Sequence, residues 1–176
     1  MSYPTQSDEI ALLDGITRKD LEVTDKLLEQ SRDIIWSDLS SEYDAEHFSD
    51  FLSQSGLPFT PEFEAFKTGW RRDELNHYLG FRQIYSILYD KSPNSIDQAM
   101  AAHQPNFAPI QEFLEDEFRI CVLIAYDELA TTRTYAQDIA LYKSFGSMPL
   151  ANWIKFVTKD RGLNKIRNYI TCGLAV

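Results

Sequence analysis

The chain has 176 residues, with 27 Asp and Glu against 17 Lys and Arg, which gives a formal net charge of -10. Apolar residues make up 44% of it, and 11 Phe, 9 Tyr and 3 Trp require an interior, so a disordered acidic chain is excluded. The length supports one domain with a sizeable core, and we expect a single domain over residues 1–176. The acidic charge is unfavourable for nucleic acid or an anionic membrane as the main partner.

Two further features bear on location. No apolar run approaches the ~20 residues that span a bilayer, and the polar, acidic N-terminus lacks the pattern of a secretory signal. The two cysteines, Cys121 and Cys172, make no disulfide framework, which is typical of a reducing compartment. The sequence therefore predicts a cytoplasmic protein without a membrane span.

The N-terminal third of the chain predicts helical structure. One segment begins at Thr17, with Asp20 as an acidic residue in its first turn. A second segment, or a continuation of the first, runs from about Ser41 to Gly56. The apolar residues of the first segment recur at helical spacing: Leu21, Leu27, Leu28, Ile34 and Ile35.

The next predicted helix has the clearest boundaries. Thr60 is a typical N-cap, Pro61 suits the first helical position, and the pattern continues to Tyr89. One face recurs at steps of three or four residues, as a single buried stripe requires. Its members are Phe63, Phe66, Trp70, Glu74, His77, Phe81, Ile84 and Leu88.

Two more helices follow a mostly polar connection. The third is predicted from about Pro109 to Phe145, and the fourth begins at Pro149. No strand alternation of useful length is present, so the predicted fold class is all-α. We expect a four-helix bundle of up-down-up-down order with a short extra N-terminal helical segment. The buried stripe of the third helix is Phe113, Glu117, Cys121, Ile124, Glu128, Thr131 and Tyr135.

Two of these stripes carry a glutamate where an apolar side chain belongs. Glu74 precedes His77 by three residues, so both point to one side of a helix, and Glu128 lies on the neighbouring stripe. A buried carboxylate is costly unless it is paired or bound to a metal. A Glu-x-x-His with a glutamate from another helix is half of a di-iron or di-manganese site. Alternatively, His77 is a core histidine, Glu74 pairs with Arg71 or Arg72, and Glu128 reaches solvent.

The two motifs resemble a known family. Trp70-Arg-Arg-Asp-Glu74-Leu-Asn-His77 resembles the E-E-x-R-H element of soluble acyl-(acyl carrier protein) desaturases, and Asp127-Glu128-Leu-Ala-Thr131 resembles their third-helix element. The resemblance covers roughly residues 40 to 165. It implies a ferritin-like, homodimeric, di-iron oxidoreductase of fatty acid metabolism. Such enzymes use O2 and an electron donor such as ferredoxin to desaturate acyl chains on acyl carrier protein.

Site residues follow from the resemblance one by one. Glu74 corresponds to a bridging metal ligand, His77 to a terminal ligand, Glu128 to the third-helix ligand, and Thr131 to the hydroxyl beside the oxygen site. For the first-helix ligand, Ser41-Glu42-Tyr43 matches best, which selects Glu42. Glu46, one turn later, is the alternative.

The fourth helix departs from the family. Asp160 takes the place of the expected glutamate, and Leu163 replaces the second histidine. The resemblance implies two irons, while this departure leaves one iron or none open. The leading hypothesis is therefore an O2-using di-iron enzyme acting on an aliphatic, carrier-bound acyl substrate. The alternative hypothesis is a non-catalytic ferritin-like bundle with a degenerate metal site and an interaction role.

Overall fold

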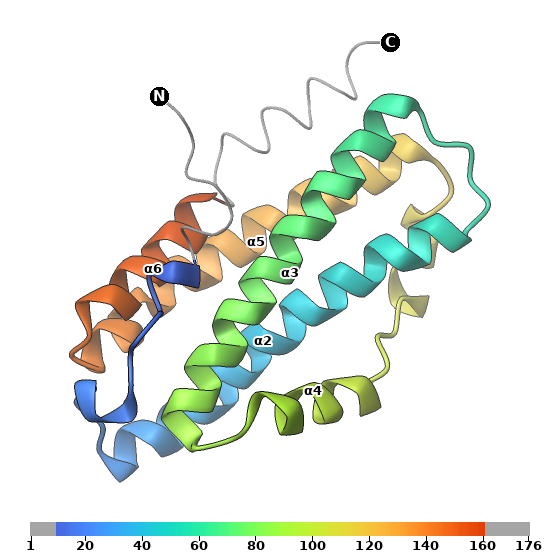
Figure 1. Ribbon diagram of the computed structural model, residues 1–176. Helices are drawn as coiled ribbons and strands as arrows, with labels where there is room; N and C mark the ends of the chain where they lie inside the picture. The colour runs from blue at the N-terminus through green and yellow to red at the C-terminus, as the bar shows by residue number, and fades with distance from the viewer. Residues whose placement is uncertain (1–9, 161–176) are drawn as a thin grey trace.

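The computed structural model describes residues 10–160, with side chains as far as residue 159. Those residues form helices and short 3-10 turns and contain no strand, so the predicted all-α class is confirmed. Figure 1 shows α2, α3 and α5 side by side, with the shorter α6 against α5. In chain order the elements are η1 (Arg18–Asp20), α2 (Asp25–Gln54), α3 (Pro61–Tyr89), α4 (Pro93–Ala102), η2 (Ala108–Phe113), α5 (Glu117–Ser144) and α6 (Met148–Asp160).

The boundaries of the helices follow from their capping residues. The Thr24 hydroxyl accepts a hydrogen bond from the Leu27 amide, and α2 then continues without a break to Gln54. Thr60 caps α3 in the same way through the Phe63 amide, with Pro61 at the first helical position, as the sequence predicts. The segments that we expected from Thr17 to Gly56 are therefore one long helix preceded by the turn η1.

The third predicted helix is shorter than expected. Pro109 and Phe113 belong to the 3-10 turn η2, and α5 begins only at Glu117, where the Asp116 carboxylate accepts a hydrogen bond from the Arg119 amide. Phe113 is 43% exposed and lies outside the buried stripe. The expectation of one helix from Pro109 was wrong because Asp116 is the stronger N-cap.

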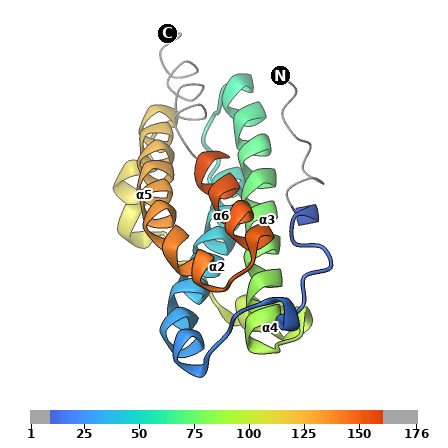
Figure 2. The same cartoon turned by 90° about the vertical axis from the view of Figure 1, so that its left-hand side faces the viewer.

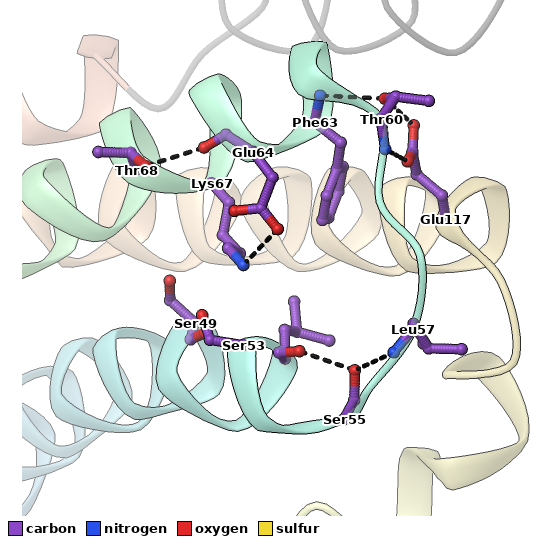
Figure 3. Close-up of polar contacts among 11 residues, drawn as sticks. Ser49, Ser53, Ser55, Leu57, Thr60, Phe63, Glu64, Lys67, Thr68 and Glu117 are labelled. Atoms are coloured by element: carbon purple, nitrogen blue, oxygen red, sulfur yellow. Dashed lines mark hydrogen bonds and ion pairs between the residues drawn. The ribbon is translucent and has the colours of Figure 1, made fainter.

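The order of helix directions also differs from our expectation. The starts of α3 and α5 meet, since the Thr60 amide and hydroxyl both donate to the Glu117 carboxylate at 2.7 Å (Figure 3). Further along, Phe81 of α3 contacts Tyr135 of α5. The two helices therefore run in the same direction, and the bundle is up-down-down-up (Figures 1 and 2).

The connection between α3 and α5 explains this order. It runs back along α2: Met100 lies 3.9 Å from the Ser40 hydroxyl, and His103 lies 2.8 Å from the Asp44 carboxylate. Phe107 then packs on Phe48, one turn further along α2. Neighbouring helices are antiparallel when the loop is short, whereas this segment is long enough to return to the other end. The predicted up-down-up-down order was therefore wrong.

Two apolar clusters fill the bundle and leave a polar layer between them. One cluster includes Leu39, Phe81 and Tyr135, and the other includes Phe48, Trp70 and Ile124. On each long helix, the residues between these two sets lie in the middle of the bundle. The predicted site residues of α2, α3 and α5 occupy this layer: Glu42, Glu74, His77 and Glu128.

Candidate metal centre

Three potential metal ligands meet in the polar layer. Glu42 comes from α2, and Glu74 and His77 come from successive turns of α3. Each offers one ligand atom, and these atoms all lie within 4.8 Å of one another. The three side chains are buried, at 1%, 0% and 1% exposure. The His77 Nδ1 atom lies 3.6 Å from Glu42 Oε2.

The chemistry of this group fits a divalent transition metal. Carboxylate oxygens and an imidazole nitrogen together suit iron, manganese or zinc, whereas an all-oxygen set would favour magnesium or calcium. Two carboxylates and a neutral imidazole balance the charge of a divalent ion. Burial removes the water that would otherwise solvate the carboxylates, so a cation there offsets a large desolvation cost. Among the residues that the structure describes, no other group of three histidines, cysteines or acids brings its ligand atoms this close together.

Aromatic side chains hold the neighbouring carboxylates in place. The Tyr135 hydroxyl of α5 donates a hydrogen bond to Glu42 Oε1. The Trp70 indole N–H donates to Glu128 Oε1 at 2.7 Å. Groups of this kind orient a metal ligand and affect the affinity of a site.

A second acid–tyrosine pair lies one turn away along α2. The Tyr142 hydroxyl donates to Asp38 Oδ2 at 2.7 Å, and both residues are buried. Burial, together with the adjacent Asp38 carboxylate, raises the pKa of Tyr142 well above its ordinary value. The phenol therefore stays protonated and remains a hydrogen-bond donor inside the bundle.

The structure separates the two candidates for the first-helix position. Glu42 joins Glu74 and His77, whereas Glu46 forms an ion pair with Arg71 at 3.0 Å. Arg71 also pairs with Asp50 at 3.1 Å.

The remaining predicted residues lie in three different places. Glu128 is buried at 1% exposure, which excludes the alternative that it reaches solvent, but its carboxylate is not part of the three-residue group. Thr131 lines a cavity beside Glu42. Asp160 is the last residue of α6, and its side chain, like Leu163, lies outside the described residues.

A cavity of about 270 Å³ adjoins the polar layer between α2, α5 and the connection before α5. Glu42 and Thr131 form part of its wall, together with Trp70 of α3. Most of the side chains that line it are apolar, among them Phe48, Phe107 and Ile124, which is typical of a small-molecule site.

Sequence reasoning missed the residues that support the carboxylates. Tyr135 lay on the predicted buried stripe of α5 and was interpreted as an ordinary core residue. Asp38 precedes Glu42 by one helical turn, so the two acids share a face of α2. That spacing could have indicated that α2 places two acids inside the bundle.

Comparisons with protein-family models, with curated proteins and with solved structures find no match to this chain. Within the described part of the chain, the helices are too short or too polar to cross a membrane. The chemical argument for the site therefore rests on its own geometry.

Proposed function

We propose that this protein is a metal-binding helical bundle of the di-iron carboxylate type, in which Glu42, Glu74 and His77 bind iron(II). One observation carries the proposal: three buried ligand groups from two helices place their ligand atoms within 4.8 Å of one another. A Glu-x-x-His on one helix with a glutamate from its neighbour is the half-site of this class. The single long crossover between α3 and α5 is also the connection used by ferritin-like folds.

The number of irons depends on residues beyond the three. Glu128 is the candidate third-helix ligand. Its carboxylate is buried and comes from α5, whereas the three grouped residues come from α2 and α3. Asp160 on α6 is the candidate fourth-helix ligand and remains a prediction from the sequence. With Leu163 in place of a histidine, we expect a second iron to bind more weakly than the first.

We further propose that the bound metal serves O2-dependent oxidation of an aliphatic substrate. Iron supplies the oxygen chemistry when bound. The chain supplies a cavity beside Glu42 that holds a substrate. The three ligand side chains are buried, which keeps water away from the metal. Thr131 lines that cavity and offers a hydroxyl to a bound molecule. A carrier-bound acyl substrate, a ferredoxin-type electron donor and a cytoplasmic location remain expectations from the resemblance.

A second candidate function is a non-catalytic interaction protein that has kept the fold. The hydrogen bonds inside the bundle favour it, because Tyr135 and Trp70 already donate to the buried carboxylates of Glu42 and Glu128. In that case the His77 ring contacts the Glu42 carboxylate, with Nδ1 at 3.6 Å from Oε2, in place of a metal bond.

Metal content separates the two candidates. Purified protein, loaded with iron(II) under anaerobic conditions and desalted, is expected to retain at least one iron per chain by elemental analysis. His77→Ala is expected to lose it, whereas His103→Ala, an exposed histidine paired with Asp44, is the matched control and keeps it. Equal iron in both variants, or none in the wild type, would favour the non-catalytic protein.

A further inference from the structure

The cavity between α2 and α5 has a size that limits what it can hold. Its volume is about 270 Å³. An apolar cavity of roughly 150 Å³ inside a protein holds one benzene molecule. At the same ratio, 270 Å³ accommodates about eleven non-hydrogen atoms. An acyl chain longer than about ten carbon atoms would therefore leave part of its length outside the cavity.

The walls of the cavity favour a ligand that is mainly apolar. Phe48 of α2 and Ile124 of α5 are buried residues that line it. A ligand that places its carbon atoms against such side chains removes apolar surface from water, which is favourable. The side chains of Ser41 and Thr131 also belong to the lining, so a ligand hydroxyl or carbonyl group finds a hydrogen-bonding partner there.

A charged ligand is accommodated less well than a neutral one. The described residues of the lining include no lysine or arginine, so a carboxylate or phosphate held inside would lack a cationic partner. Two acids of the lining are already bonded within the chain. The Tyr135 hydroxyl donates to Glu42, and His103 lies 2.8 Å from the Asp44 carboxylate. We therefore expect a neutral polar group on the ligand.

One wall residue comes from the long connection rather than from a long helix. Phe107 precedes η2 in the segment that returns along α2 (Figure 1). Its ring lies 5.1 Å from the rings of Phe48 and Phe51, measured between centroids. Among the described residues, Phe107 is the one that lines both this cavity and a second hollow, which Phe51 and Gln111 also line. Shortening its side chain would extend the cavity toward that hollow.

We propose that the cavity binds an uncharged, mainly apolar molecule of about eleven non-hydrogen atoms or fewer, and that Phe107 sets this limit. The claim that this molecule is the substrate rests on the proposed function, whereas its binding does not. Under the proposed function, the enzyme acts on short neutral compounds and discriminates against long acyl chains.

Straight-chain alcohols from 1-butanol to 1-dodecanol test the limit on size. Calorimetry on the chelator-treated, full-length protein is expected to show binding that strengthens about four-fold with each CH2 group that enters the cavity. The gain should stop at about ten carbon atoms. Octanoate, which is similar in size to 1-octanol, tests the charge. It should bind at least about ten-fold more weakly, because its carboxylate finds no cationic partner.

Three variants locate the site. Phe107→Ala should extend the limit by about two carbon atoms or more, since the removed ring leaves space. Phe113→Ala is the matched control, because it removes a ring of η2 that is 43% exposed and outside the lining, and it should leave the limit unchanged. Ala45→Phe places a ring inside the cavity and should weaken binding of 1-octanol at least about ten-fold.

Four results would each overturn the proposal. The first is no binding of 1-octanol at millimolar concentration, or undiminished binding in Ala45→Phe. The second is an affinity of the wild type that keeps rising as far as 1-dodecanol. The third is octanoate binding as tightly as 1-octanol. The fourth is a limit that is the same in Phe107→Ala as in the wild type, or that Phe113→Ala shifts equally.

The same titrations are run with iron-loaded protein. Alcohol binding without any iron retention would contradict the proposed function and leave the cavity assignment standing. Iron retention without alcohol binding would do the reverse.

Discussion

We expect Glu74→Gln to be more stable than the wild type without metal and less stable than the wild type with metal. The exchange keeps the shape of the side chain and removes one buried charge, at a residue with 0% exposure. Two carboxylates whose ligand atoms lie within 4.8 Å of each other repel by at least about 3.5 kcal/mol at an effective dielectric constant of about 20. Because a buried carboxyl also relieves its cost by binding a proton, we expect a smaller gain, about 2 kcal/mol, for the metal-free variant.

With metal the order is expected to reverse. A ligand present at a hundred times its dissociation constant stabilises the folded state by about 2.7 kcal/mol. Wild type should gain this stability from manganese(II), and Glu74→Gln should not, since it has lost a ligand. Urea unfolding with chelator and with manganese(II) measures both effects.

Glu46→Gln is the matched control, because it removes a carboxylate from α2 that pairs with Arg71 outside the group. Its response to manganese(II) should equal that of the wild type. The reasoning fails if Glu74→Gln destabilises the metal-free protein. That outcome would mean that the Glu74 carboxylate is part of a structural ion-pair network.

Two further substitutions test the surroundings of the site. Tyr135→Phe removes the hydrogen bond to Glu42 and should weaken metal binding about ten-fold in a chelator competition, with the helical circular dichroism unchanged; unchanged affinity would show that the phenol does not orient the ligand. Gly80→Ala should destabilise the fold by about 2 kcal/mol or more, since a Cβ there would lie 2.0 Å from Trp153 Cζ2. Gly69→Ala, also in α3 but with open space around it, should be neutral or stabilising by up to about 1 kcal/mol, and equal urea midpoints for the two variants would refute the packing argument.

Local signals in the sequence were sufficient for the helices with strong caps. Thr60 and Pro61 located the start of α3, and the stripe through Glu74 and His77 is buried as its period predicts. The start of α5 was misplaced because Pro109 suits a 3-10 turn as well as the first turn of a helix. Capping at Asp116 could have been recognised from its residue type.

Helix direction could not be obtained from the same signals. The apolar period shows which face of a helix is buried, but it is the same whichever way the helix runs in the bundle. The return of the connection depends on contacts far apart in sequence, such as His103 with Asp44 and Glu117 with Thr60. Those pairs become visible only when the whole fold is assembled.

The candidate site was accessible to sequence reasoning to different degrees. Glu74 and His77 share one helix, so their spacing alone places them together. The choice of Glu42 over Glu46 required the resemblance, since both lie one turn apart on α2, and the structure groups Glu42 with the other two. The supporting hydrogen bond from Tyr135 joins α5 to α2, and no local pattern encodes it.

The most direct test of the metal centre is anomalous X-ray scattering from crystals of iron-loaded protein, measured on both sides of the iron absorption edge. The account predicts an iron peak bonded to carboxylate oxygens of Glu42 and Glu74 and to a ring nitrogen of His77, whose ligand atoms already lie within 4.8 Å of one another. A weaker second peak beside Glu128 would fit the proposed loss of affinity at the other half-site. Crystals with no iron peak among these three side chains, and with His77 in a hydrogen bond to Glu42, would contradict the central claim.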